Sequence, residues 1–464
     1  MVLAIRNKHT PKLKKLTVTS PKTLDGGIHG SSDLLVMRAI FFPLIASAVA
    51  AHAAELSVNA YPSIQEALNA NPNRMIFVPA GDYPIRDKIR IRGDRAGLFG
   101  PGRIIQTKND QPIIEIENAT NAEVRDVTLL RPEGAMETHN EAILAIKCRD
   151  LVMENVRVID NRSNAGTITI RESKDCRVSH CLVRNYMRVS VDDRTKPDDT
   201  GYAFNCTDGT GISVSYSTGT LIEGNRITEE VFFPTPEVRD QYKLGKFVKK
   251  NRNRGLLISQ QAWDAEYTDN WRQGSGIIVT APEVSDLTRI IGNHIENAAQ
   301  GIDIHSDHVI ISHNVVHNSH MGMKAMHGSR NVIITGNHFS KNDLWAIGLM
   351  PGVASHAAEG DKPDNSDGGS VIANNIISGF GHGSAHWMWG NERSPFRFDS
   401  GQEDSDPPLS EVMIQGNIVN NVGSPVYAWD VIISTDRHPP QGLHFANNLF
   451  PPGTRGVCNQ ELPP

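Results

Sequence analysis

The sequence of 464 residues lacks a strong charge excess and is poor in aromatic residues. Its net charge of −6 argues against general nucleic-acid binding. Aromatic residues make up only 6 %, yet a hydrophobic content of 39 % is too high for a disordered chain. With 39 Gly and 26 Pro, the composition is typical of a β-rich protein with many turns.

Cysteine is also scarce. The five cysteines include no CxxC pair, and their odd number supports neither a disulfide framework nor a zinc site. We expect Cys148, Cys176 and Cys181 to fill space in the core, as small apolar side chains do.

No apolar run is long enough for a transmembrane helix. The apolar segment 39–50 follows the basic start Met37-Arg38 and precedes the small-residue pattern Ala51-His52-Ala53, which indicates a signal peptide over residues 37–53. Residues 1–36 are then a leader or a mis-assigned start, and residues 54–464 are the mature domain. We expect a secreted or periplasmic protein without a membrane anchor, although a membrane anchor or an unrelated core segment is the alternative reading of residues 39–50.

A short repeat stands out in the sequence. Residues 301–337 contain one unit twice, and the asparagine that ends each copy recurs after 337 − 314 = 23 residues. A repeat of this length, made of short β-rich runs, is typical of one rung of a parallel β-helix. Alternation points Ile302 inward and Asp303 outward, and stacking of the two copies places Asp303 about 4.8 Å from Lys324.

An asparagine-type position marks the rungs along the chain. Stacked amides of this kind form hydrogen-bonded ladders within turns. The predicted ladder positions are Asn155, His180, Asn225, Asn293, Asn314, Asn337, Asn375, Asn417 and Asn448. Where the intervals are too long, the excess residues must leave the stack, which predicts groove-forming loops over 188–210, 228–274, 350–369 and 380–410.

The N-terminal part of the mature chain predicts a capping element. Ser63 and Glu66 form a capping box at the start of a short helix, and the segment V-P-A-G-x-Y with alternating strands follows. This arrangement resembles the N-terminal cap and first rungs of the pectate-lyase superfamily. The resemblance implies an all-β fold, a single-stranded right-handed parallel β-helix, with the helix covering its open end.

Outward-facing side chains of the first strand in each rung predict the site. One row comprises Thr169, Ser213, Ile278, Asp303, Lys324 and Gly348, and the next comprises Arg171, Ser215, Thr280, His305, Met326 and Met350. Titratable groups gather at the middle rungs, where the superfamily carries its substrate groove. The predicted catalytic residues are Asp303, His305, Lys324 and His327, although a simple surface ion pair between Asp303 and Lys324 is the alternative.

A second, local resemblance concerns the segment Met326-His327-Gly328 followed by Asn337. It is similar to the Arg-His-Gly segment of chondroitinase-B-like and alginate lyases, in which the preceding rung supplies a Lys base. Met326 stands at the Arg position and His305 near the Lys position, so only His327 and Gly328 match directly. The resemblance therefore implies lyase chemistry with a different base.

Further residues are predicted to bind substrate or a metal. Exposed aromatic rings in the long loops can stack on sugars, or can instead pack the loops onto the solenoid. The predicted substrate-binding residues are Arg171, Asp307, Trp263, Trp271, Tyr202 and Trp387. No spacing matches a transition-metal site, and Ca²⁺ is the metal that loop carboxylates allow. Those carboxylates are Asp192, Asp193, Asp198 and Asp199.

Three functions follow from these residues. The first is a polysaccharide lyase that removes the proton α to a uronate carboxylate, with His305 or Lys324 as base and Arg171 or Lys324 screening the charge. The second is a glycoside hydrolase or glycan transferase that uses two carboxylates, Asp303 with Asp307, and with Asp264 as a third candidate. The third is a non-catalytic glycan-binding β-helix.

Overall fold

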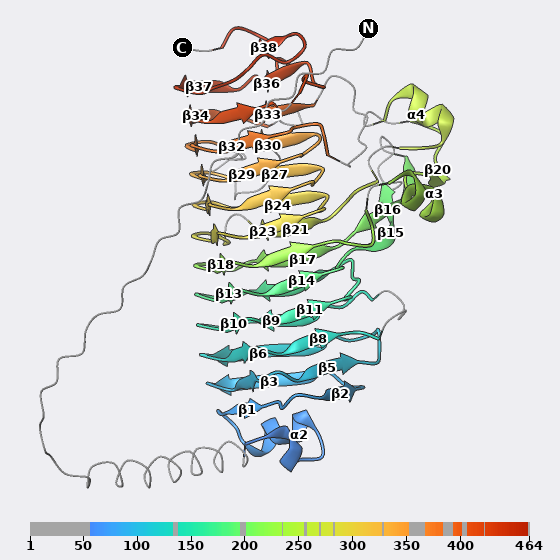
Figure 1. Cartoon of the computed structure of the whole chain (residues 1–464), viewed down its shortest axis with the longest axis vertical. Helices are drawn as coiled ribbons and strands as arrows, with labels where there is room; N and C mark the ends of the chain where they lie inside the picture. The colour runs from blue at the N-terminus through green and yellow to red at the C-terminus, as the bar shows by residue number, and fades with distance from the viewer. Residues whose placement is uncertain are drawn as a thin grey trace, which may run out of the picture. The chain divides into compact units, whose positions relative to one another are not determined.

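Strands that stack in parallel dominate the structure, a computed structural model (Figure 1). It describes residues 56–132, 138–194, 201–233, 235–254, 258–268, 271–281, 284–326, 329–351, 367–383, 393–400, 406–421 and 423–462. The predicted leader and signal peptide lie outside these residues. No helix within the described ranges is long and apolar enough to span a membrane.

The described strands form three long parallel sheets, because each rung contributes one strand to each sheet. Sheet A has 12 strands in the order β1 (Met75–Phe77), β4 (Gly97–Phe99), β7 (Glu123–Arg125), β10 (Val152–Glu154), β13 (Arg177–Ser179), β18 (Leu221–Glu223), β22 (Arg289–Ile291), β25 (Ile310–Ser312), β28 (Ile333–Thr335), β31 (Val371–Ala373), β34 (Ser410–Gln415) and β37 (Gln441–Ala446). Sheet B has 11 strands in the order β2 (Asp82–Ile85), β5 (Arg103–Gln106), β8 (Thr128–Leu130), β11 (Arg157–Ile159), β14 (Leu182–Arg184), β19 (Arg226–Thr228), β23 (His294–Glu296), β26 (Val315–His317), β29 (His338–Ser340), β32 (Ile376–Ser378) and β35 (Ile418–Asn420). Sheet C has 12 strands in the order β3 (Ile89–Asp94), β6 (Ile114–Thr120), β9 (Ile143–Ile146), β12 (Gly166–Arg171), β17 (Thr210–Ser215), β21 (Ser275–Thr280), β24 (Gln300–Ile304), β27 (Met321–Met326), β30 (Trp345–Met350), β33 (Ser394–Phe398), β36 (Trp429–Ile433) and β38 (Gly456–Cys458). The prediction of a parallel β-helix is confirmed, and its turns follow the right-handed rule of parallel crossovers.

The register of sheet C fixes which side chains face the core. Ile212, Ile277 and Ile302 lie at paired positions on successive strands, and none of them is exposed to solvent. Rungs approach so closely at Gly301 that a Cβ atom there would lie 2.3 Å from the carbonyl oxygen of Gly322. Glycine is therefore required at position 301, near the start of β24, and the repeat places Gly322 at the matching position of its second copy.

A ladder of asparagine side chains runs through the turns that join sheet A to sheet B. The Nδ2 atom of Asn337 donates to Oδ1 of Asn375 over 2.9 Å and to the carbonyl oxygen of Ile311 over 3.0 Å. Its Oδ1 accepts from Asn314, both from the backbone N–H at 2.9 Å and from Nδ2 at 3.0 Å. The same pattern links Asn225, Asn293, Asn314, Asn337, Asn375, Asn417 and Asn448.

Two predicted ladder positions are wrong by one residue. Asn155 and His180 have φ angles of 53° and 55° and occupy the left-handed turn position that Gly224 takes one rung later. The ladder position of the rung that contains His180 belongs to Cys181, whose backbone N–H donates to Oδ1 of Asn225 over 2.8 Å. Asparagine favours both positions, because it tolerates a positive φ and also forms amide ladders.

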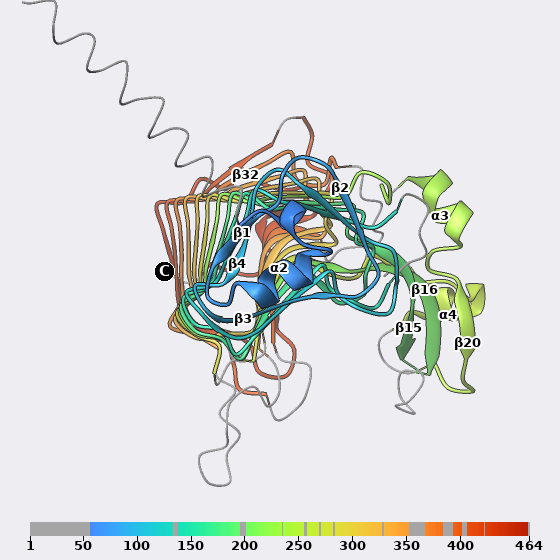
Figure 2. The same ribbon diagram turned by 90° about the horizontal axis from the view of Figure 1, so that it is seen from below.

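The predicted N-terminal cap is present. Helix α2 (Ile64–Ala70) begins after Ser63, whose hydroxyl accepts from the backbone N–H of Glu66 over 3.1 Å. A single 3₁₀ turn, η1 (Val58–Ala60), precedes it. Figure 2, which looks along the stack, shows α2 lying across the first rungs. The apolar side chains Ile64, Ala67 and Leu68 are buried there, so α2 covers the open end of the core.

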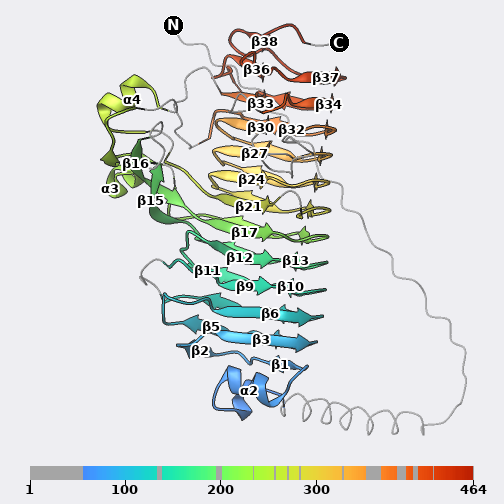
Figure 3. The same ribbon diagram turned by 180° about the vertical axis from the view of Figure 1, so that it is seen from behind.

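Two of the segments expected to be loops contain regular structure of their own. Strands β15 (Arg188–Arg194), β16 (Tyr202–Asp208) and β20 (Phe247–Lys250) form a separate antiparallel sheet, accompanied by α3 (Pro236–Tyr242) and α4 (Gln260–Ala265). Figure 3 shows this insertion beside the strands of sheet C. The expected loop 350–369 lies mostly outside the described residues, whereas the expected loop 380–410 contains strand β33.

The ladder generates a stability prediction. Asn337→Ala removes hydrogen bonds on both sides of a buried amide and leaves buried partners unsatisfied, so we expect the free energy of unfolding to fall by about 1–3 kcal/mol. Chemical denaturation will measure this loss. The matched control is Asn155→Gly, since glycine accepts the positive φ and the site is exposed; its change should stay below about 0.5 kcal/mol. Equal losses of stability in the two variants would contradict the assignment of Asn337, and not Asn155, to the asparagine ladder.

Candidate active site

Strands β24 and β27, which are neighbours in sheet C (Figure 3), bring the central candidate residues together. Asp303 and Lys324 are direct partners in the parallel register, as the repeat predicts. His305 follows β24 immediately, and its backbone N–H donates to the carbonyl oxygen of Val279 over 2.7 Å. The stack therefore fixes the backbone of all three residues.

Asp303 lies between two basic side chains. Its Oδ1 is 2.9 Å from Nε2 of His305, and its Oδ2 is 3.4 Å from Nζ of Lys324. The hydroxyl of Ser275 lies 3.5 Å from the same Oδ2 and 3.4 Å from Oε1 of Gln300. We refer to Asp303, His305 and Lys324 as the triad.

The triad is more buried than outward-facing side chains on a bare sheet would be. The side chains of Asp303, Lys324 and His305 are only 6 %, 14 % and 19 % exposed. The ion pair between Asp303 and Lys324 is therefore mostly buried, and not solvated as the surface-pair alternative supposes. Substituting one member of the triad would leave the charge of its partner uncompensated in a partly desolvated place. We therefore expect such substitutions to lower the free energy of unfolding more than substitutions at exposed positions do.

Electrostatics favour the ionised form of Asp303. Burial by itself would raise the pKa of this carboxyl, but the Lys324 ammonium and then the His305 ring outweigh burial and hold the pKa below its usual value. A carboxylate that stays ionised can orient His305 and stabilise positive charge on its ring. It is poorly suited to act as a general acid, which needs a raised pKa.

The other candidate carboxylates do not complete a hydrolytic pair with Asp303. Asp307 is held by Arg330, whose backbone N–H donates to Oδ1 over 2.9 Å and whose Nε and Nη2 atoms lie 3.2 Å from Oδ2. Asp264 lies on α4 of the insertion, where its carboxylate accepts from Gln260 over 2.9 Å. The geometry therefore gives Asp307 a structural role in the turn, and its predicted substrate contact stays a prediction.

Arg171 is not part of the triad. It lies on β12, three strands before β24 in sheet C, which corresponds to about 14 Å along the stack. Its Nε atom lies 3.7 Å from Oε1 of Glu172, and its side chain is 45 % exposed. His327 and Trp387 lie outside the described residues, so their predicted roles stay predictions.

The aromatic residues of the insertion have a different role from the predicted one. Tyr202, Trp263 and Trp271 are only 2 %, 8 % and 3 % exposed, so their rings cannot stack on a sugar from solvent. Tyr202 packs against Phe247 at a centroid distance of 5.1 Å, and Phe247 packs against Trp263 at 6.0 Å. Tyr202, Phe247 and Trp263 belong to a hydrophobic core of the insertion that is separate from that of the solenoid.

Sequence reasoning missed two residues near the triad. Arg397 on β33 lies in the same row as Lys324, with Gly348 between them. The indole of Trp345 covers Gly348, since a Cβ atom there would lie 3.0 Å from Cε3 of the ring. Extending the row by one rung would have found Arg397, but the predicted loop over 380–410 concealed β33.

A metal site finds no support in the described ranges. They contain no cluster of three or more His, Cys, Asp or Glu residues placed to hold a metal ion. Of the four loop carboxylates proposed as calcium ligands, Asp198 and Asp199 lie outside those ranges, as does the side chain of Asp193. Calcium binding therefore stays a prediction.

The lowered pKa of Asp303 gives a pH-dependent prediction. Its folded pKa lies below the unfolded value, so ionised Asp303 stabilises the fold above the unfolded pKa, and this stability is lost as pH falls through the folded pKa. Asp303→Asn should therefore reduce the free energy of unfolding by roughly 1–3 kcal/mol at neutral pH. The difference from the unmodified protein should shrink below about pH 4.

Denaturation curves across this pH range test the prediction, with Asp82→Asn as the control. Asp82 forms an exposed ion pair with Arg103 at 3.1 Å, and such pairs contribute about 0–1 kcal/mol. If the difference in the free energy of unfolding between Asp303→Asn and the unmodified protein did not depend on pH, this would contradict the statement that Asp303 is ionised in the folded protein.

Comparison with known proteins gives structural matches only. No protein-family model and no curated protein matches the sequence. The Dettilon tailspike protein aligns at 12 % identity over 85 % of this chain and 64 % of its own, with a TM-score of 0.54. The A-module of the mannuronan C-5 epimerase AlgE4 from Azotobacter vinelandii aligns at 11 % identity over 88 % and 98 %, with a TM-score of 0.48. The alginate lyase AlyF-OU02, in complex with G6, aligns at 11 % identity over 88 % of each chain, with a TM-score of 0.46.

Identities this low show a shared fold and leave the reaction to be argued from the site. The tailspike match and the topology of the chain agree with the fold that the pectate-lyase resemblance implies. The described strands of sheets A, B and C form a right-handed parallel β-helix.

Proposed function

We propose that this protein is an exported carbohydrate-active enzyme that cleaves an acidic, uronate-containing polysaccharide by β-elimination. The observation that carries the proposal is the placement of Asp303 between His305 and Lys324 on the outer face of a rigid sheet. A histidine oriented by a carboxylate, with a cation beside it, matches the two requirements of this reaction.

The first requirement is a base. The proton on the carbon α to a uronate carboxylate is weakly acidic, so a neutral base must lie close to it. In the proposed reaction His305 takes the substrate proton, while the Asp303 carboxylate, which can only accept, orients the ring through its contact with Nε2. Asp303 then stabilises the imidazolium that forms, as an acidic partner does for a catalytic histidine.

The second requirement is charge stabilisation. As the α proton leaves, negative charge grows on the uronate carboxylate, and a positioned cation lowers the energy of that state. Lys324 supplies this charge next to His305, and Arg397 supplies a second cation two strands further along the same row. The electrons of the broken C–H bond form the double bond, the glycosidic C–O bond breaks, and water protonates the leaving oxygen.

The hydrolase and transferase alternatives receive less support from the same residues. A hydrolase needs a protonated carboxyl and a second carboxyl facing it across the bond. Asp303 has a lowered pKa, and Asp307 is occupied by Arg330. A non-catalytic glycan-binding protein would not require a buried carboxylate held between a histidine and a lysine.

Activity screening separates these functions. Acidic and neutral polysaccharides are incubated with the enzyme, and unsaturated product is followed by ultraviolet absorbance beside a reducing-end assay. Unsaturated product supports the lyase; reducing ends without unsaturation mean hydrolysis. In deuterated water, label at the α carbon of uncleaved polymer would mean proton abstraction without elimination.

Substitution of His305 tests the assignment of the base. His305→Ala should lower turnover by about 100-fold or more, because it removes the positioned general base. The matched control is Arg90→Ala, which lies in the outward row of Asp303 but near the N-terminal end of sheet C, with a side chain that is 55 % exposed. Full activity of His305→Ala with folded protein would place the base elsewhere.

Export is part of the proposal and has its own prediction. If residues 37–53 are a signal peptide, the secreted protein should begin at about Ala54 or Glu55. N-terminal sequencing of exported material measures this directly. Secreted protein that retains Met1 would contradict it, and would leave the chemistry of the triad unaffected.

A further inference from the structure

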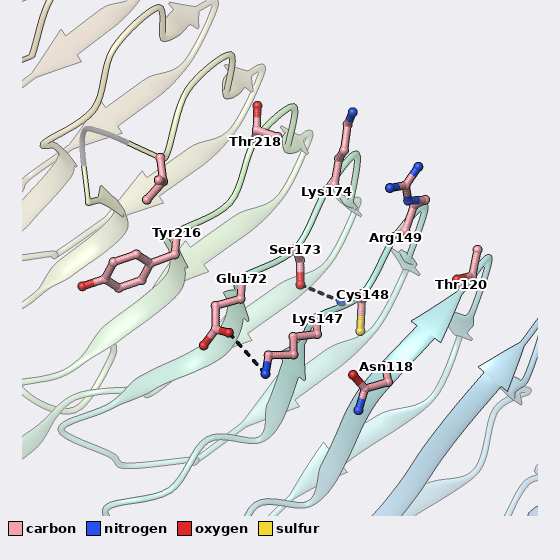
Figure 4. A pocket seen from close by; sticks show the side chains of 11 residues that line it. Asn118, Thr120, Lys147, Cys148, Arg149, Glu172, Ser173, Lys174, Tyr216 and Thr218 are labelled. Atoms are coloured by element: carbon pink, nitrogen blue, oxygen red, sulfur yellow. Dashed lines mark hydrogen bonds and ion pairs between the residues drawn. The ribbon is translucent and has the colours of Figure 1, made fainter.

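A cavity lies on the ridge where strands of sheet C turn into sheet A. It has a volume of about 640 Å³ and spans the rungs of β6, β9, β12, β17 and β21 (Figure 4). These strands lie one to five strands before β24 in the order of sheet C. The residues that line the cavity do not include the triad, and the proposed reaction does not use them.

Two columns of side chains form the walls of this cavity. One column directly follows the strands and includes Lys147, Glu172 and Tyr216, whose φ angles are 55°, 51° and 51°. The other lies two residues further on and includes Arg149 and Lys174. Figure 4 shows the two columns extending in different directions, which leaves a trough that runs along the stack.

The floor of the trough is a fixed part of the solenoid. Cys148 and Ser173 lie between the two columns and are only 3 % and 5 % exposed. The hydroxyl of Ser173 accepts from the backbone N–H of Cys148 over 3.0 Å, which ties one rung to the next. The walls thus project from a backbone that repeats once per rung, about every 4.8 Å.

One wall carries two adjacent cations. Arg149 and Lys174 are paired through a parallel β-bridge, so their backbones lie one strand spacing apart, and both side chains are exposed. Neither forms an ion pair with any residue of the described ranges, including Asp150 and Asp175 that follow them. Like charges on neighbouring strands repel, and a bound anion would relieve that repulsion.

The opposite wall combines charge with an aromatic face. Tyr216 is 57 % exposed although it holds a positive φ, an unusual conformation for a bulky side chain. The Glu172 carboxylate has two basic neighbours: its Oε2 lies 3.7 Å from Nζ of Lys147, and its Oε1 lies 3.7 Å from Nε of Arg171. An exposed phenol ring offers a flat apolar surface for a sugar, and the carboxylate offers an acceptor for hydroxyl groups.

We propose that this trough, lined by Lys147, Arg149, Lys174 and Tyr216, is a second, non-catalytic binding site for a linear acidic oligosaccharide. Carboxylates of the ligand lie against Arg149 and Lys174, and one sugar ring stacks on Tyr216. The class of ligand rests on the proposed function, since an enzyme for an acidic glycan meets long chains that extend beyond its active site. Binding here raises the local concentration of the polymer at the triad.

The experiment measures binding without cleavage. A purified oligogalacturonate is titrated by calorimetry into His305→Ala protein, with a cello-oligosaccharide as the neutral probe. Adding Arg149→Gln and Lys174→Gln should weaken oligogalacturonate binding by about 10-fold or more, as expected for lost charge-assisted hydrogen bonds. The matched control is Arg157→Gln with Arg226→Gln, which removes the same charge from exposed positions on sheet B and should leave the affinity unchanged.

Hydrogen exchange locates the bound oligosaccharide. Protection of residues 147–149 and 172–174 on adding oligogalacturonate supports the trough. Protection confined to 300–305 and 321–326 overturns it and leaves the proposed function standing. Protection of the trough in a protein that cleaves no acidic polysaccharide supports the binding site and counts against the lyase. Equal weakening by both double variants, or equal binding of the neutral probe, also overturns the proposal.

Discussion

Parallel stacking in constant register is the constraint on which the rest of this structure depends. Each rung satisfies the backbone N–H and C=O groups of its neighbours, so a rung has no stability apart from the stack. The asparagine ladder strengthens the same constraint inside the turns, because one amide bonds to the rungs before and after it. A shift of one residue would break the ladder and turn the inward isoleucines toward solvent.

The candidate active site depends on this register. Asp303 and Lys324 are 324 − 303 = 21 residues apart in the sequence, yet the parallel register places them at directly paired positions on neighbouring strands. Their partial burial then changes the chemistry, because a desolvated carboxylate between two basic groups stays ionised and can orient His305. The rigid sheet also limits how far these side chains can move, which favours a preorganised site.

The sequence predicted the parts of the molecule that follow a local rule. Ser63 and Glu66 identify the capping helix, and the repeat within residues 301–337 identifies the register that joins Asp303 to Lys324. Burial was not predictable in the same way. Tyr202 and Trp263 read as exposed loop aromatics, but they form the core of the insertion, because distant segments of the chain meet there. The errors at Asn155 and His180 arose because two neighbouring turn positions favour the same kind of residue.

The insertion is built from two separate segments of the chain. Strands β15 and β16 leave between β14 and β17, whereas α3, β20 and α4 leave between β19 and β21, and the two excursions pair with each other at β16 and β20. Each departs from the stack and returns to it in register. A segment of this kind can change its length and surface during evolution while the rungs stay as they are. The solenoid and the insertion are therefore free to diverge at different rates.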